Sequence, residues 1–173
     1  TSFPEDGLEK NILLRKADMA MYYAKYQGKS NYSHFAEHME LVIADKLIIH
    51  NRLRHALVNN EFEIYYQPQY DLMNNVISGA EVLIRWRDSN GQFLSPAYFI
   101  PIAEEQGIIR LIGKWVYSEA FSKAKEWEKS HNTKLSFTVN VSAHELMDDR
   151  FAETFINLLD SYDIDASQVA VEI

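Results

Sequence analysis

The sequence predicts an α/β fold in which the chain forms the first half of a (β/α)8 TIM-like barrel. From residue 61 onward, short apolar strand patterns alternate with helical patterns, which is typical of a parallel sheet or barrel with helical crossovers. About four strand patterns lie between residues 61 and 173, whereas an eight-stranded barrel takes about 250 residues. The last pattern stops at Ile173 in mid-strand. We therefore expect half of a barrel, in a chain truncated at both ends.

Two helices are predicted before the barrel region. The first runs to about Tyr26 with apolar residues at spacings of three and four, and Gly28 stands where a C-terminal cap belongs. Residues 32–35 are predicted to form an edge strand. A longer helix is predicted over residues 37–59, with apolar positions near heptad spacing and Lys46 filling one gap. Because the sequence pattern changes after this helix, we interpret it as the join between two domains.

The predicted barrel elements alternate in a regular order. The strands cover residues 62–67, 76–86, 134–141 and 168–173, and the helices cover residues 97–106, 108–130, 142–147 and 150–161. Residues 68–75 form a turn between the first two strands, and residues 89–92 form a hairpin-like loop. The first of these helices follows Ser95-Pro96, where proline suits the first helical position.

The composition is that of a soluble globular protein, with 47% hydrophobic and 24% charged residues. A formal net charge of -8 argues against binding to a nucleic acid polymer or an anionic membrane. An anionic ligand would need a local basic site or a bridging cation. The absence of cysteine excludes disulfides and thiolate chemistry, which fits a cytoplasmic protein. No run approaches the roughly 18 apolar residues of a membrane helix, although an inner-membrane anchor elsewhere in a longer parent stays open.

The strand at residues 79–86 has one apolar and one mixed face. Val82, Ile84 and Trp86 alternate with Glu81, Leu83 and Arg85 at a period of two. Charges in an apolar strand are costly unless they are paired, hydrated or bound to a metal. A surface strand with a Glu/Arg stripe is the alternative.

Two later strands repeat the arrangement. Asn140 and Glu172 lie near the ends of their strands, opposite the apolar faces, as Glu81 does. In a barrel these polar faces converge at the end where active sites lie. Two carboxylates and an amide oxygen suit Mg²⁺, Mn²⁺ or Ca²⁺ better than zinc. The sequence therefore predicts an oxygen-rich metal site.

Several motifs resemble the EAL family of cyclic-di-GMP phosphodiesterases. They are Tyr66-Gln67-Pro68, Glu81-Val82-Leu83-Ile84-Arg85-Trp86, residues 95–105 (SPAYFIPIAEE), Val139-Asn140-Val141-Ser142-Ala143 and Val171-Glu172-Ile173. Residues 1–36 resemble the C-terminal end of a GGDEF diguanylate cyclase domain, through Pro4-Glu5-Asp6-Gly7, the run from Ala17 to Lys25, and Gly28-Lys29-Ser30-Asn31. The chain then divides into a GGDEF tail at 1–36, a linker helix at 37–60 and the N-terminal half of an EAL domain at 61–173.

The resemblance implies a role for each matching residue. Glu81, Asn140 and Glu172 match metal ligands, and Gln67, Leu83 and Arg85 match substrate-binding positions. The implied reaction is hydrolysis of cyclic-di-GMP to linear pGpG with Mg²⁺ or Mn²⁺, with Ca²⁺ as an inhibitor. The implied partners are cyclic-di-GMP, a second copy through the EAL domain, and an upstream sensory domain in the parent.

The sequence also departs from the family pattern. Val82 replaces an alanine, His144-Glu145 replace the usual Arg-Gln, and the later Asp-Asp and lysine motifs lie beyond Ile173. We expect the parent to be active and this fragment to be inactive, with no catalytic residue here beyond the metal ligands. Because the Gly-Gly-Asp-Glu-Phe signature is absent, the chain is not expected to be a cyclase. A catalytically inactive cyclic-di-GMP receptor and a dimer-forming unit stay open as alternatives.

Overall fold

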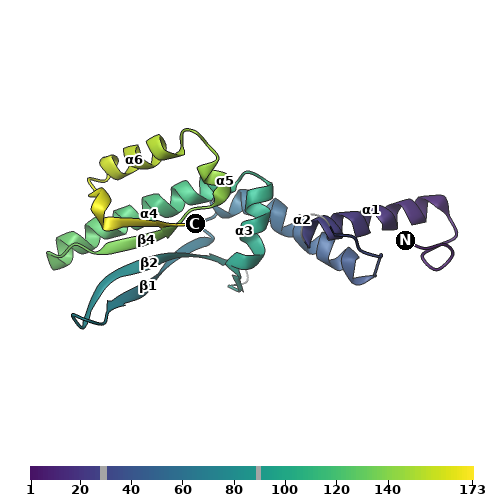
Figure 1. Cartoon of the computed structure of the whole chain (residues 1–173), viewed down its shortest axis with the longest axis horizontal. Helices are drawn as coiled ribbons and strands as arrows, with labels where there is room; N and C mark the ends of the chain where they lie inside the picture. The colour runs from purple at the N-terminus through teal and green to yellow at the C-terminus, as the bar shows by residue number, and fades with distance from the viewer. Residues whose placement is uncertain (28–30, 89–90) are drawn as a thin grey trace. The chain divides into compact units, whose positions relative to one another are not determined.

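The computed structural model describes residues 1–27, 31–88 and 91–173 of the chain. The chain divides into two compact units, Thr1–Asn51 and Arg52–Ile173 (Figure 1). No helix in the described ranges is long and apolar enough to cross a membrane.

The first unit contains α1 (Lys10–Tyr26) and most of α2 (His38–Ala56). The rings of Tyr23 and His38 meet edge to face with their centroids 5.5 Å apart. The prediction of a strand at residues 32–35 is wrong, because these residues have no regular structure. Within its described residues this unit contains no strand that could pair with them. The predicted cap at Gly28 lies outside the described residues.

Helix α2 buries the positions that its sequence pattern predicts. Met39, Ile49, Leu53 and Ala56 are buried, and Lys46 between them is only 4% exposed. The Lys46 ammonium lies 5.7 Å from the centroid of the Tyr22 ring, within range of a cation–π interaction. The boundary between the two units falls inside this helix, after Asn51.

The second unit is built on a mixed sheet with the strand order β1-β2-β4-β5. Its strands are β1 (Phe62–Asp71), β2 (Val76–Arg87), β4 (Ser136–Asn140) and β5 (Val169–Glu172), and the short β3 (Phe93–Leu94) pairs with β2. The pairs β2–β4 and β4–β5 are parallel. The predicted α/β class and half barrel are therefore confirmed.

The first strand pair corrects the expected parallel sheet. Strands β1 and β2 run antiparallel, because the few residues between them cannot make the long crossover that a parallel pair requires. Strand β1 also continues through Pro68 to Asp71, beyond its predicted end at residue 67. Proline is tolerated there because β1 is an edge strand, and the register shift between Gln69 and Tyr70 follows shortly after it.

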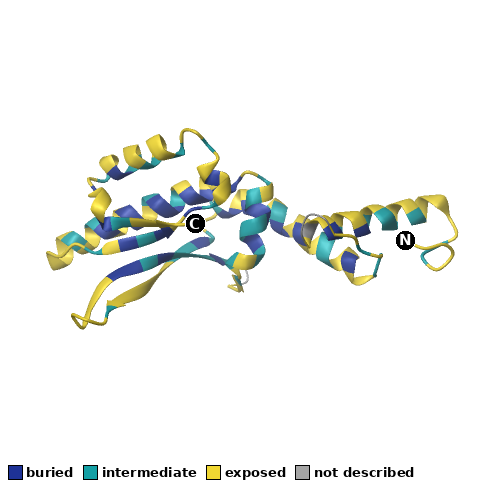
Figure 2. Ribbon diagram, viewed as in Figure 1, coloured by how far each residue is buried: buried dark blue, intermediate teal, exposed yellow. Residues whose placement is uncertain are grey.

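Helices cover one face of this sheet. They are α3 (Pro96–Glu105), α4 (Ile109–His131), α5 (Ala143–Leu146) and α6 (Phe151–Ser161), followed by the 3₁₀ turn η1 (Ala166–Gln168). Helix α4 contacts β1, β2 and α6. Figure 2 shows buried positions along α4 and in the middle of β2 and β4, whereas the far end of the β1–β2 hairpin is exposed.

The core of the second unit lies between these helices and the apolar strand faces. The largest fully buried side chains of this unit are Trp86, Phe99, Phe121, Leu53, Ile112 and Val139. Gly79 is needed where β2 and β4 pair, since a Cβ there would lie 2.6 Å from the carbonyl oxygen of Ser136. The close pairing of β2 with β4 brings the mixed face of β2 beside the polar face of β4.

Candidate functional site

Strand pairing places the predicted site residues on one face of the sheet. Glu81 on β2 lies opposite Gln67 on β1 and opposite Thr138 on β4. Side chains that lie directly opposite each other on paired strands point to the same face. Gln67 is exposed and Glu81 is half-buried. The face therefore offers an amide beside a carboxylate at the middle of the sheet.

The strand ends bring a second amide and a second carboxylate to this face. Asn140 lies opposite Glu172 in the parallel pair β4–β5. The Asn140 amide nitrogen donates a hydrogen bond to Glu81 Oε1 over 2.9 Å. The backbone N–H of Val141 donates to the carbonyl oxygen of Glu172 over 2.8 Å, which extends the pairing past the last residue of β4. The structure thus brings Glu81, Asn140 and Glu172 together on neighbouring strands.

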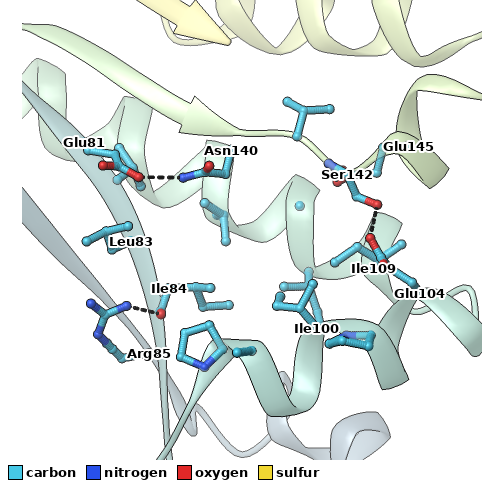
Figure 3. A pocket seen from close by; sticks show the side chains of 18 residues that line it. Glu81, Leu83, Ile84, Arg85, Ile100, Glu104, Ile109, Asn140, Ser142 and Glu145 are labelled. Carbon is cyan, nitrogen blue, oxygen red and sulfur yellow. Dashed lines mark hydrogen bonds between the residues drawn. The ribbon is translucent and has the colours of Figure 1, made fainter. Parts of the chain in front are cut away.

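Leu83 and Arg85 follow Glu81 along the same face of β2. Both are half-buried, and they line a cavity of about 470 Å³ together with Glu81, Asn140 and residues of α3 and α4. Figure 3 shows Glu81 and Asn140 pointing toward one another beside this cavity. The Arg85 guanidinium donates to the carbonyl oxygen of Ile84 over 2.9 Å and lies 5.7 Å from the centroid of the Tyr65 ring. The guanidinium has further N–H groups that can donate to an anion.

The donor set fits a divalent cation that prefers oxygen. Within residues 1–27, 31–88 and 91–173, neither Glu81 nor Glu172 forms an ion pair with a cationic side chain, so their charge is not neutralised by the protein. Because the amide nitrogen of Asn140 faces Glu81, its Oδ1 is left as an acceptor. The same described ranges hold no group of three His, Cys, Asp or Glu side chains suited to a metal. The candidate ligand set is two carboxylates and one amide oxygen.

Val82, which replaces the alanine of the family motif, does not lie on this face. Val82 is 2% exposed and lies opposite the fully buried Val139, on the side of the sheet that packs against the helices. The larger side chain therefore fills the core and leaves the polar face unchanged, as the alternation predicts.

A hydrogen-bonded cluster behind Asn140 was not predicted. Ser142 Oγ donates to Glu104 Oε1 on α3 over 2.5 Å (Figure 3). The Ser142 backbone N–H donates to Glu145 Oε2 over 3.0 Å. Tyr117 on α4 donates its hydroxyl to Glu145 Oε1 over 3.0 Å. The spacing Ser142-x-x-Glu145 is a capping box, so the sequence did contain a signal for this contact.

The two buried groups of this cluster have shifted pKa values. Burial raises the pKa of the Glu145 carboxyl, although the bonds from Ser142 and Tyr117 partly oppose that shift. Burial, followed by the nearby Glu145 carboxylate, raises the pKa of the Tyr117 hydroxyl. Tyr117 thus remains a neutral donor to Glu145 at any ordinary pH.

Gln69 and Thr138 add one further polar contact to the face. The Gln69 amide donates to Thr138 Oγ1 over 3.0 Å, linking β1 to β4 across β2. Period-two alternation places Thr138 on this face, whereas the end predicted for β1 at residue 67 left Gln69 in a turn.

Glu81 lies in the middle of β2 and not near its end as predicted, whereas Asn140 and Glu172 are the last residues of β4 and β5. The fold and the site define a class: an α/β barrel-type domain with an oxygen-rich site on the polar face of its sheet. The chain belongs to the EAL domain family, whose sequence model matches residues 50–173.

Curated relatives and a solved structure support this membership. The chain is 36% identical over 171 residues, or 98% of its length, to the signaling protein YkoW of Bacillus subtilis. It is 30% identical over 171 residues, or 99% of its length, to the bifunctional diguanylate cyclase/cyclic di-GMP phosphodiesterase MucR of Pseudomonas aeruginosa. A solved structure of the MucR phosphodiesterase in complex with c-di-GMP matches 73% of the chain with a TM-score of 0.69 and 28% identity. The chain spans 21% and 25% of the two relatives and 51% of the solved chain.

Proposed function

We propose that the protein carrying this chain is a cyclic-di-GMP phosphodiesterase that hydrolyses cyclic-di-GMP to linear pGpG. The observation that supports it best is the hydrogen bond between Asn140 and Glu81, with Glu172 in register with Asn140 on the next strand. Membership of the EAL family adds the substrate, because the similar MucR structure is named as a phosphodiesterase in complex with c-di-GMP.

We propose that Glu81, Asn140 and Glu172 hold Mg²⁺ or Mn²⁺. When bound, the ion supplies Lewis-acid stabilisation of the developing phosphate charge and lowers the pKa of water. The three residues lie on the neighbouring strands β2, β4 and β5 of one sheet, so strand pairing sets the spacing of their Cα atoms. A cation at this position would also allow an anionic substrate to bind to a chain of net charge -8.

Gln67, Leu83 and Arg85 are proposed to bind the substrate. Arg85 lines the cavity next to the carboxylate site, and its guanidinium is suited to a phosphate oxygen as a charged donor. Gln67 lies opposite Glu81, where its amide is within reach of a ligand on the same face. Leu83 lies between Glu81 and Arg85 and supplies an apolar contact.

The test is turnover of cyclic-di-GMP by the full-length protein with Mg²⁺ or Mn²⁺, followed by chromatography of pGpG. Formation of pGpG that depends on the added ion and is lost in Glu81→Ala supports the proposal. Tight binding of cyclic-di-GMP without pGpG at any ion concentration would instead establish the receptor alternative.

The domain boundaries stay a prediction, as do the location in the cell and any upstream sensory domain. We propose that residues 1–36 are the end of a GGDEF domain, supported by the match of MucR, a protein named for both activities, to 99% of the chain. We also propose a homodimer through the EAL domain. Light scattering of the full-length protein tests the dimer.

A further inference from the structure

The segment that follows Asn140 is held by partly buried hydrogen bonds to two different helices. Ser142, two residues after Asn140, donates through its hydroxyl to Glu104 and through its backbone N–H to Glu145. Its hydroxyl also accepts the backbone N–H of His144 over 3.1 Å. The chain therefore leaves β4 in a direction that α3 and α5 determine together.

Glu145 is the central group of this cluster. Its side chain is 4% exposed, and each of its carboxylate oxygens accepts one hydrogen bond, from Tyr117 and from Ser142. Gly113 on α4 faces this carboxylate so closely that a Cβ there would clash with it. A buried carboxylate is costly unless its oxygens are paired. This arrangement keeps Glu145 in one position and transmits the position of α4 to Ser142.

We infer that Glu145 positions Asn140 for the metal ion through the main chain of Ser142, and that Tyr117 holds Glu145 in place. This inference rests on the proposed metal-binding role of Asn140. Glu145 is thus a positioning residue that does not itself contact the ion. Glu104 supports the same segment from α3 through the Ser142 hydroxyl. Groups that orient metal ligands typically contribute about 10- to 100-fold to metal affinity.

The chemistry of Glu145 explains which substitutions preserve this role. Glutamine retains an oxygen for the Ser142 N–H, and its amide can donate to the Tyr117 hydroxyl, which then turns to act as an acceptor. Glutamine also completes a capping box. Leucine has a similar volume but removes both acceptors and leaves the Ser142 N–H and the Tyr117 hydroxyl without their partner. Glu145→Gln and Glu145→Leu are therefore a matched pair.

The experiment measures Mn²⁺ affinity of the full-length protein without substrate, by electron paramagnetic resonance titration. Glu145→Leu is expected to weaken Mn²⁺ binding about 10-fold or more, while Glu145→Gln remains within about threefold of the parent. Tyr117→Phe keeps the ring contact with Phe155 and is expected to weaken binding by an intermediate factor. Tyr117→Phe provides the test if Glu145→Leu does not fold.

The control is Phe121→Leu, a core variant on α4 whose ring contacts the rings of Phe155 and Tyr162. It is expected to lower the melting temperature and leave Mn²⁺ affinity unchanged. Parent-like Mn²⁺ affinity in folded Glu145→Leu and Tyr117→Phe overturns the inference, even if the parent hydrolyses cyclic-di-GMP. If the unsubstituted protein binds Mn²⁺ but forms no pGpG, the proposed function fails. Loss of Mn²⁺ binding in the two variants would still support the inference in that case.

Discussion

The amide nitrogen of Asn140 donates a hydrogen bond to Glu81 Oε1 over 2.9 Å, although 59 positions separate the two residues in the chain. They meet because β2 and β4 are parallel neighbours, with Gly79 allowing their backbones to approach closely. The bond fixes the carboxylate and leaves the amide oxygen available.

Removing the Glu81 carboxylate is expected to abolish hydrolysis without unfolding the protein. Glu81→Ala removes a proposed ligand from the half-buried polar face, so turnover should fall by about 100-fold or more, since even groups that only orient ligands contribute about 10- to 100-fold. Turnover is measured together with the circular dichroism spectrum. Surviving turnover in a folded variant would remove Glu81 from the ligand set.

Arg85→Lys tests whether the guanidinium binds a phosphate. Lysine keeps the positive charge but loses the planar set of donors, so KM should rise by about tenfold, equivalent to about 1.4 kcal/mol, with the melting temperature nearly unchanged. Arg85→Met, which removes the charge, should raise KM further. An unchanged KM in both variants would exclude Arg85 from substrate binding.

Val82→Ala tests whether the larger residue in the EAL motif serves packing alone. Val82 is buried against Val139, so losing two methyl groups should lower the free energy of unfolding by about 1–3 kcal/mol. The rate per folded molecule should stay within about twofold of the parent. Denaturant unfolding and turnover at low temperature check both statements, and a loss of turnover at an unchanged folded fraction would contradict them.

Gly79→Ala is expected to loosen the pairing of β2 with β4. Its Cβ would lie 2.6 Å from the Ser136 carbonyl oxygen, a contact that can be relieved only by moving backbone, which costs about 1–3 kcal/mol. Ser78→Ala, an exposed change one residue earlier, is the control and should have little effect. Equal melting temperatures for the two variants would show that β2 and β4 can move apart to accommodate the Cβ without a loss of stability.

The buried Glu145 carboxyl predicts a pH dependence of stability. Because burial raises its pKa in the folded protein, the folded state binds more protons than the unfolded state between the unfolded and folded pKa values. The contribution of Glu145 to stability is therefore fully present below its unfolded pKa and is lost as the pH rises through the raised folded pKa.

The comparison with Glu145→Gln isolates this effect. The free energy of unfolding of the parent, relative to that of Glu145→Gln, should decrease as the pH rises from about 4. Urea unfolding of both proteins at a series of pH values measures the difference. If the difference in the free energy of unfolding is constant or increases with pH, burial does not disfavour the charged form of the Glu145 carboxyl.

Period-two alternation was enough to predict which residues of β2 and β4 face the core. Val82, Trp86 and Val139 are buried, and Glu81 and Asn140 lie on the other face. Local patterns also placed the helices within a few residues, because apolar stripes and breakers act over one or two turns. The predicted strand at 32–35 failed because a strand depends on a partner strand, which sequence spacing alone does not provide.

The sequence by itself determined the α/β class, the polar face of each strand and the EAL family motifs, because these depend on alternation and on residue identity. Only the tertiary structure decided that β1 runs antiparallel, that Asn140 bonds to Glu81, and that Glu145 joins α4 to the segment after Asn140. These contacts join residues far apart in the chain, and their geometry depends on the packing of helices and strands around them.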